Sequence, residues 1–181
     1  GANGDPVVCI SLSSELSATM QSAQTAAKAI GDDLDLTVLD SKSITAGLGL
    51  QVLAAAELAE QGGSVAEIVA LVEDHRSRTH VFGALDTLEN LKKGGRIGSA
   101  KALLGSMLSV KPIIRIVDGT VEEAGKQRTR RRALEFLRDK LFEEPVVEEL
   151  SVLHGEAPDI DDFLDMISSR YPRESIRLGK I

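Results

Sequence analysis

Aromatic side chains, cysteine and histidine are all scarce in this sequence. Phe, Tyr and Trp together make up 3% of the 181 residues, and Trp is absent. Single-stranded nucleic acid binds by stacking its bases on aromatic rings, so this composition argues against such a platform. A hydrophobic content of 43% still predicts a globular protein, whose interior must be built mainly from Val, Ile, Leu and Ala.

The only cysteine, Cys9, excludes a disulfide within the chain and suits a reducing compartment, so we expect a cytoplasmic protein. The three histidines, His75, His80 and His154, form no recognisable pair, which argues against a zinc site. We therefore expect neither a metal nor a cofactor. No apolar run reaches the length of a membrane span, so we expect no stable insertion into a membrane.

The overall charge is acidic. Lys and Arg number 21 against 28 Asp and Glu, which gives a formal net charge of −7. Because a nucleic-acid-binding protein needs a broad basic surface, we expect no nucleic-acid partner. The one local concentration of positive charge is the run from Lys126 to Arg132.

The first part of the chain alternates strand and helix patterns. A buried strand is predicted over residues 7–12, followed by a helix that runs to Ile30 and a second strand over residues 34–40. Two further helices follow, the second opened by the capping box Ser64–Glu67. This alternation indicates a parallel sheet covered by helices, so we expect an α/β domain over residues 1–77.

The second part of the chain mixes a hairpin with helices. Asp118 and Gly119 lie between two strand-like runs, which is a strong signal for a tight hairpin turn. A helix is predicted from Arg130, and a strand and a last helix follow it. We expect this part, residues 78–181, to form a separate α+β domain.

Several serines lie in the connection between the first predicted strand and the first predicted helix. Ser11, Ser13, Ser14 and Ser17 lie in this turn. One of them can cap the helix, which is the commonest role of serine at such a position. The others, with the free N–H groups of a helix N-terminus, can hold a carboxylate or a phosphate. The turn lacks the pattern G-x-S-x-G, so we expect no nucleophilic serine and no catalytic residue.

The basic run also has two interpretations. Lys126, Arg128 and Arg130 precede or begin a predicted helix, where positive charge opposes the helix dipole. They can form a solvated face paired with acidic neighbours, or a docking patch for an anionic partner. Arg96, in a turn bounded by glycines, is either a cation at a helix end or a further partner contact.

Three segments of the chain carry recognisable patterns. "ISLSSELSATMQSAQTAA" is similar to the serine-rich pattern S-S-x-L-S-G-T, and "VLDSKSITAGLGL" is similar to the pattern D-S-x-x-x-S-x-G-x-G. The third segment runs from "LDTLENLKKGGRIG" to "KQRTRRRAL". All three resemble signatures of the DegV family, the third its longest, and they occur in the family's order, so the resemblance extends over essentially the whole chain.

The resemblance implies a bacterial fatty-acid-binding protein. Members of the family enclose one long-chain fatty acid and present its carboxylate to a fatty acid kinase, which makes acyl phosphate for phospholipid synthesis. By resemblance, Ser13 and Ser14 hold the carboxylate, and Arg96, Lys126, Arg128 and Arg130 are candidates for docking the kinase. The chain is then a binding subunit and not an enzyme by itself.

The sequence departs from the family pattern at three places. Ala18 replaces the usual glycine after the third serine. The family's earlier strand with a D-S motif and its final H-x-G-P-G segment have no counterpart, so we expect both domains to be incomplete at their outer ends. Two alternatives remain: a small kinase or phosphotransferase related to dihydroxyacetone kinase, against which the missing P-loop argues, and a regulatory module that senses lipid.

Overall fold

A computed structural model describes residues 4–181 of the chain, with the side chains of residue 32 and residues 104–109 left aside. The structure divides into two compact units. The first runs to Val81 and also contains the hairpin tip Ile116–Val121, and the second contains Phe82–Arg115 and Glu122–Ile181. The boundary that we expect after residue 77 lies close to this division, but sequence patterns gave no reason to assign the hairpin tip to the first unit.

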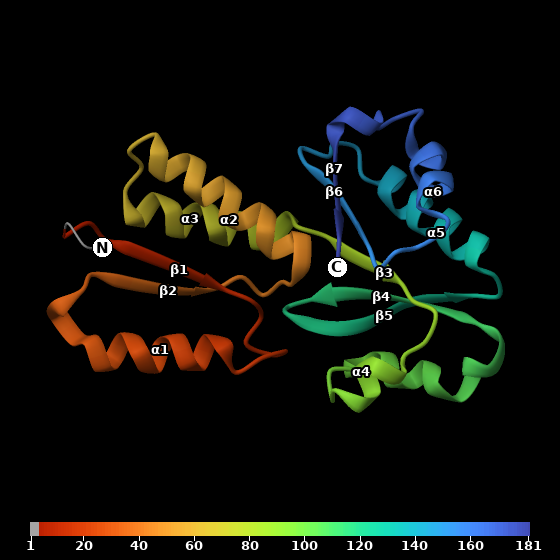
Figure 1. Cartoon of the computed structure of the whole chain (residues 1–181), viewed down its shortest axis with the longest axis horizontal. Coiled ribbons are helices and arrows are strands. Elements are labelled where there is room, and N and C mark those ends of the chain that lie inside the picture. The colour runs from red at the N-terminus through yellow and green to blue at the C-terminus, as the bar shows by residue number, and fades with distance from the viewer. Residues whose placement is uncertain (1–3) are drawn as a thin grey trace. The chain divides into compact units, whose positions relative to one another are not determined.

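The first unit is built on a parallel pair of strands. β1 (Val7–Ser11) pairs with β2 (Leu36–Asp40) in a register that sets Val7 beside Leu36 and Ser11 beside Asp40. Figure 1 shows one helix on one side of this pair and two helices on the other. These helices are α1 (Thr19–Ile30), α2 (Thr45–Glu60) and α3 (Val65–Arg78), and the turn η1 (Gly31–Asp33) follows α1. The predicted α/β class is therefore confirmed.

The core of this unit lies between the strands and the two helices α2 and α3. Ala55, Ile68 and Val72 are buried together, and partly buried aliphatic residues from both strands pack against them. The predicted capping box is present, since Ser64 Oγ accepts from Glu67 N while the Glu67 carboxylate accepts from Ser64 N. Helix α3 is thereby held at a defined start, and its buried residues, Ile68 and Val72, lie one turn apart.

The second unit contains the hairpin apart from its tip, which belongs to the first unit, and a further pair of strands. The sheet has the order β3-β4-β5, and β6 pairs in parallel with β7. Asp118 and Gly119 both have positive φ, 47° and 84°, as a type I′ hairpin turn requires. The strands are β3 (Val81–Ala84), β4 (Lys111–Val117), β5 (Thr120–Gln127), β6 (Leu150–His154) and β7 (Ile176–Lys180).

Helices pack on the strands of this second unit. Leu164 and Ile167 are buried against Ile176, and this cluster joins α6 to the β6–β7 pair. The helices are α4 (Glu89–Lys93), the 3-10 segment η2 (Gly98–Ser109), α5 (Arg130–Glu143), α6 (Ile160–Ile167) and the turn η3 (Arg173–Ser175). Within residues 4–181, no helix combines the length and the apolar character that crossing a bilayer requires.

Candidate functional site

The serine turn (Ser11–Ser17) lies beside the loop that follows β2, which we call the second serine loop (Asp40–Thr45). Ser41 N donates to Ser11 O at 2.9 Å, and Ser13 N donates to Ser43 O at 2.9 Å. The carboxyl ends of two parallel strands meet at one edge of a sheet, which is where α/β proteins bind ligands. The two serine-containing loops therefore meet at this edge of the strand pair.

Ser13 is fully buried, and its hydroxyl is used within the protein. Ser13 Oγ donates to the carbonyl oxygen of Gly119 at 2.7 Å and accepts from Glu15 N at 3.2 Å. A Cβ atom on Gly119 would lie 2.3 Å from Ser13 Oγ, so the hairpin turn approaches as closely as only glycine allows. Ser13 thus fastens the hairpin tip to the serine turn, a contact that no sequence pattern indicated.

Ser14 is exposed, and its two hydrogen-bond donors both face a carboxylate. Ser14 Oγ donates to Asp40 Oδ2 at 2.6 Å, and Ser14 N lies 3.3 Å from Asp40 Oδ2 and 3.4 Å from Oδ1. Lys42 N donates to Asp40 Oδ1 at 2.8 Å from the other side. A hydroxyl and two backbone N–H groups thus hold a carboxylate, and no arginine or lysine side chain among the described residues joins them. Asp40 is brought to this place by the strand register, which sets it beside Ser11 and which the sequence alone does not show.

The other serines of the turn divide the remaining roles. Helix α1 begins at Thr19, and its N-cap residue, Ala18, makes no side-chain capping bond. Ser17 Oγ accepts from Thr19 N at 3.3 Å, so capping falls to Ser17. Ser13 and Ser14 lie ahead of this helix, in a turn whose own carbonyl at Ser13 accepts from Ser17 N. The carboxylate-holding groups at Ser14 therefore come from the turn, not from the first turn of α1.

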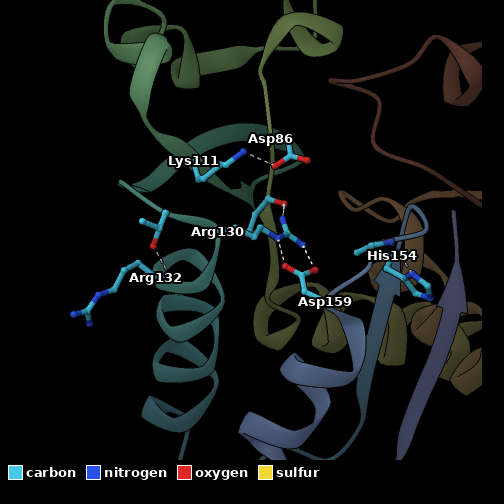
Figure 2. A network of polar contacts seen from close by, with 9 residues as sticks. Asp86, Lys111, Arg130, Arg132, His154 and Asp159 are labelled. Atoms are coloured by element: carbon cyan, nitrogen blue, oxygen red, sulfur yellow. Dashed lines mark hydrogen bonds and ion pairs between the residues drawn. The ribbon is translucent and has the colours of Figure 1, made fainter.

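Arg130, one of the docking candidates, is held inside the second unit (Figure 2). Its Nε donates to Asp159 Oδ2 at 2.8 Å, its Nη2 to Asp159 Oδ1 at 3.3 Å and its Nη1 to the carbonyl oxygen of Ala84 at 3.1 Å. The guanidinium so joins the start of α5 to the start of α6 and to the end of β3. These hydrogen bonds from Arg130 hold the pKa of Asp159 below its ordinary value.

A second ion pair lies close to this network. Lys111 Nζ donates to Asp86 Oδ1 at 2.8 Å, and this bond is the main reason that the pKa of Asp86 is lowered (Figure 2). His154 Nδ1 accepts from Ala157 N at 3.2 Å, so this histidine stabilises the turn after β6, as a structural residue does. Among the residues that the structure describes, no group of His, Cys, Asp and Glu is arranged to hold a metal.

The remaining basic residues fall into two groups. Arg131 and Arg132 both pair with Glu135, at 3.2 and 3.0 Å, which fits the solvated face with acidic neighbours. Lys126 and Arg128 are exposed, on β5 and in the connection to α5, and no ion pair joins them to another described residue. Arg96 is exposed and donates to the carbonyl oxygen of Gly94. All docking candidates lie in the second unit, and their docking role stays a prediction.

The chain matches one known protein family over its whole length. Residues 1–181 match the family model described as "Uncharacterised protein, DegV family". A DegV domain-containing protein of Streptomyces coelicolor is 38% identical over 176 residues, which cover 94% of this chain and 61% of the relative. A DegV domain-containing protein of Listeria innocua is 36% identical over 166 residues, covering 90% and 59%. The chain therefore spans about three fifths of the length of these relatives.

Solved structures agree with the sequence comparison. A fatty-acid-binding DegV family protein from Thermus thermophilus has a TM-score of 0.82 and 33% identity, over 97% of this chain and 64% of that one. DegV from Bacillus subtilis, also a fatty acid binding protein, has a TM-score of 0.80 and 30% identity, over 97% and 64%. The predicted family and fold are confirmed.

Proposed function

Because the chain belongs to the DegV family, we propose that the protein binds a long-chain fatty acid and holds its carboxylate at the serine turn. The observation that carries this proposal is the family match over all 181 residues, together with the likeness to the fatty-acid-binding protein from Thermus thermophilus. Burying a methylene group contributes roughly 0.8 kcal/mol, so a long acyl chain supplies most of the binding free energy and the carboxylate fixes its orientation.

The geometry at Ser14 supports a carboxylate as the bound group. The N–H and O–H of Ser14 already face the oxygens of Asp40, in the arrangement that an acyl carboxylate would need. A bound fatty acid must therefore share these donors with Asp40 or take its place. Ser13 contributes by fixing the turn through Gly119 rather than by offering a spare donor.

We further propose that the protein presents the carboxylate to a fatty acid kinase and does not itself transfer a phosphoryl group. The family resemblance supports this part, and Lys126 and Arg128 are the cations best placed for docking, since they are exposed and joined to no acidic side chain among the described residues. Such a role belongs in the cytoplasm, where the kinase and its ATP are found and where Cys9 stays reduced.

The first experiment is organic extraction and mass spectrometry of the protein purified from a bacterial host. A fatty acid in stoichiometric amount is expected, and its identity would reveal the preferred chain length. A bound ligand can be lost on purification, so the same sample is also titrated with palmitate carrying a carboxyl carbon-13 label. A folded protein that carries no lipid and shifts no carboxyl resonance would refute the proposal. Phosphorylation of a small molecule by the protein alone would instead favour the kinase alternative.

A further inference from the structure

The first unit contains a cavity that the serine turn does not line. It has a volume of about 270 Å³ and lies among the second serine loop, the end of α3 and the hairpin tip. Ser43, Gln51, Glu73, Arg76 and Asp118 are among the residues of its wall, while Ser13 and Ser14 are not. All of these wall residues belong to the first unit, so the cavity is complete within it.

Two buried polar atoms in this wall have no hydrogen-bond partner among the described residues. Gln51 is 1% exposed, and its Nε2 donates to Ser41 O at 3.1 Å, whereas its Oε1 accepts from nothing. Arg76 Nε is buried in the same wall and donates to nothing. Buried polar groups are almost always hydrogen-bonded, because an unpartnered one loses its hydration without compensation.

One of the two atoms is a hydrogen-bond donor and the other is an acceptor, so a ligand that satisfies both must carry an acceptor and a donor. Arg76 Nε–H needs an acceptor, and the positive guanidinium favours an anionic oxygen. Gln51 Oε1 is an acceptor and needs an O–H or N–H donor. The volume exceeds what a few water molecules fill, since one water occupies about 30 Å³ of liquid. Lys42 adds a second cation to the wall, and the carboxylates of Glu73 and Asp118 balance the two cations, so the anion is selected by the unpartnered Arg76 Nε rather than by net charge.

We infer that this cavity binds a small anion that also carries a hydroxyl group, of the hydroxycarboxylate or polyol phosphate class. The anionic oxygen accepts from Arg76 Nε, and the hydroxyl donates to Gln51 Oε1. This site is separate from the proposed fatty-acid site. The inference does not depend on whether the protein binds fatty acid. It lies against the second serine loop, whose Asp40 holds Ser14.

The test uses pairs of probes that differ by one feature. L-Lactate and propionate differ by a hydroxyl group, and glycerol 3-phosphate and glycerol differ by the anion. Binding is measured by calorimetry and by NMR signals of the Gln51 side-chain amide and the Arg76 Nε–H. At least one of lactate and glycerol 3-phosphate should bind about tenfold or more tightly than its partner and shift both signals. The stronger of the two identifies the anion as carboxylate or phosphate.

Variants assign the contacts. Arg76→Gln should weaken the binding probe about tenfold or more, while Arg78→Gln, an exposed arginine two residues later in the same helix, should leave it unchanged. Gln51→Met keeps the side-chain length and should remove the preference for the hydroxyl. If Arg76→Gln fails to fold, Arg76→Lys is used instead. Lysine retains the positive charge but lacks the guanidinium Nε–H, so this variant tests whether that donor is needed for binding. The inference fails if neither probe shifts either signal up to about 10 mM, or if the shifts persist unchanged in the Arg76 variant.

Discussion

At the scale of single residues, the two adjacent serines differ in what they can offer a ligand. Ser13 is fully buried and has both a donor and an acceptor bond inside the protein. Ser14 is exposed, and its hydroxyl bonds only to Asp40, which is also reachable by solvent. A hydroxyl can change partner at an exposed position without leaving a buried group unpaired. Ser14 is therefore the residue whose removal reports on ligand binding rather than on folding.

Replacing Ser14 by alanine tests the carboxylate site. The variant loses one hydroxyl donor to a charged group, which is worth about 1.5–3 kcal/mol, so fatty-acid affinity should fall about tenfold to a hundredfold. Displacement of a fluorescent fatty acid gives the dissociation constant. The matched control is Ser22→Ala on the exposed face of α1, where the hydroxyl donates only to Ala18 O. If both variants bind within twofold of the parent, Ser14 does not hold the carboxylate.

At the scale of elements, the sequence allowed most helices and strands to be predicted, but not the contacts between them. A continuous apolar run identified β1, alternation of apolar and polar residues identified β2, and helical spacing of apolar residues identified α3. No strand was predicted at β7, where Leu178 is exposed and Gly179 follows it, because the burial pattern there does not alternate regularly. Ser14 was predicted from a motif, whereas its partner Asp40 depends on strand register, which a sequence alone does not show.

Two glycines in α2 have opposite consequences for stability. A Cβ on Gly47 would lie 2.2 Å from Ser43 Oγ and 2.6 Å from Val81 Cγ2, whereas a Cβ on Gly49 would meet nothing within 4 Å. Gly47→Ala should destabilise the protein by about 1–3 kcal/mol through overpacking. Gly49→Ala should stabilise it by about 0.5–1 kcal/mol, because alanine favours the helix. Urea unfolding followed by circular dichroism measures both. If the two changes have equal effects on the free energy of unfolding, the surroundings of Gly47 accommodate a Cβ atom and the overpacking argument is wrong.

The segment between β5 and α5 provides the test of kinase docking. Reversing Lys126 and Arg128 to glutamate should slow acyl phosphate formation by a partner kinase about tenfold, since steering by charge sets association rates. Fatty-acid affinity should not change. The control reverses Arg131 and Arg132, whose charges already pair with Glu135.

Arg130 is left intact in this test because its loss would disturb α5 and α6. Acyl phosphate formation followed at several salt concentrations separates docking from chemistry, because screening weakens only the docking step. Equal slowing by the control pair would mean that net charge matters and the identity of the patch does not. Unchanged rates in the Lys126 and Arg128 variant would remove these residues from any docking surface.

At the scale of the whole molecule, the single tyrosine allows the second unit to be followed separately from the rest. Tyr171 packs against the cluster around Leu164 and Ile167, and the sequence contains no tryptophan. Tyrosine fluorescence therefore reports on the second unit, whereas far-ultraviolet circular dichroism reports on both. If the two transitions do not coincide, unfolding of the protein is not two-state and the two units unfold independently.

This difference in probes makes the acid response of the second unit measurable. Arg130 lowers the pKa of Asp159 in the folded state, so folding favours the ionised carboxylate. The resulting stability is fully present above the ordinary aspartate pKa of about 3.9 and is lost as the pH falls through the lower folded value.

Asp159→Asn should lower the free energy of unfolding at pH 7 by about 1–2 kcal/mol and flatten its decline in acid. Asp139→Asn, an exposed carboxylate on α5, is the charge-matched control. Urea unfolding followed by tyrosine fluorescence between pH 7 and about pH 2.5 makes the comparison. If parent and Asp159→Asn decline in parallel through this range, the Arg130–Asp159 pair does not govern the acid stability of the second unit.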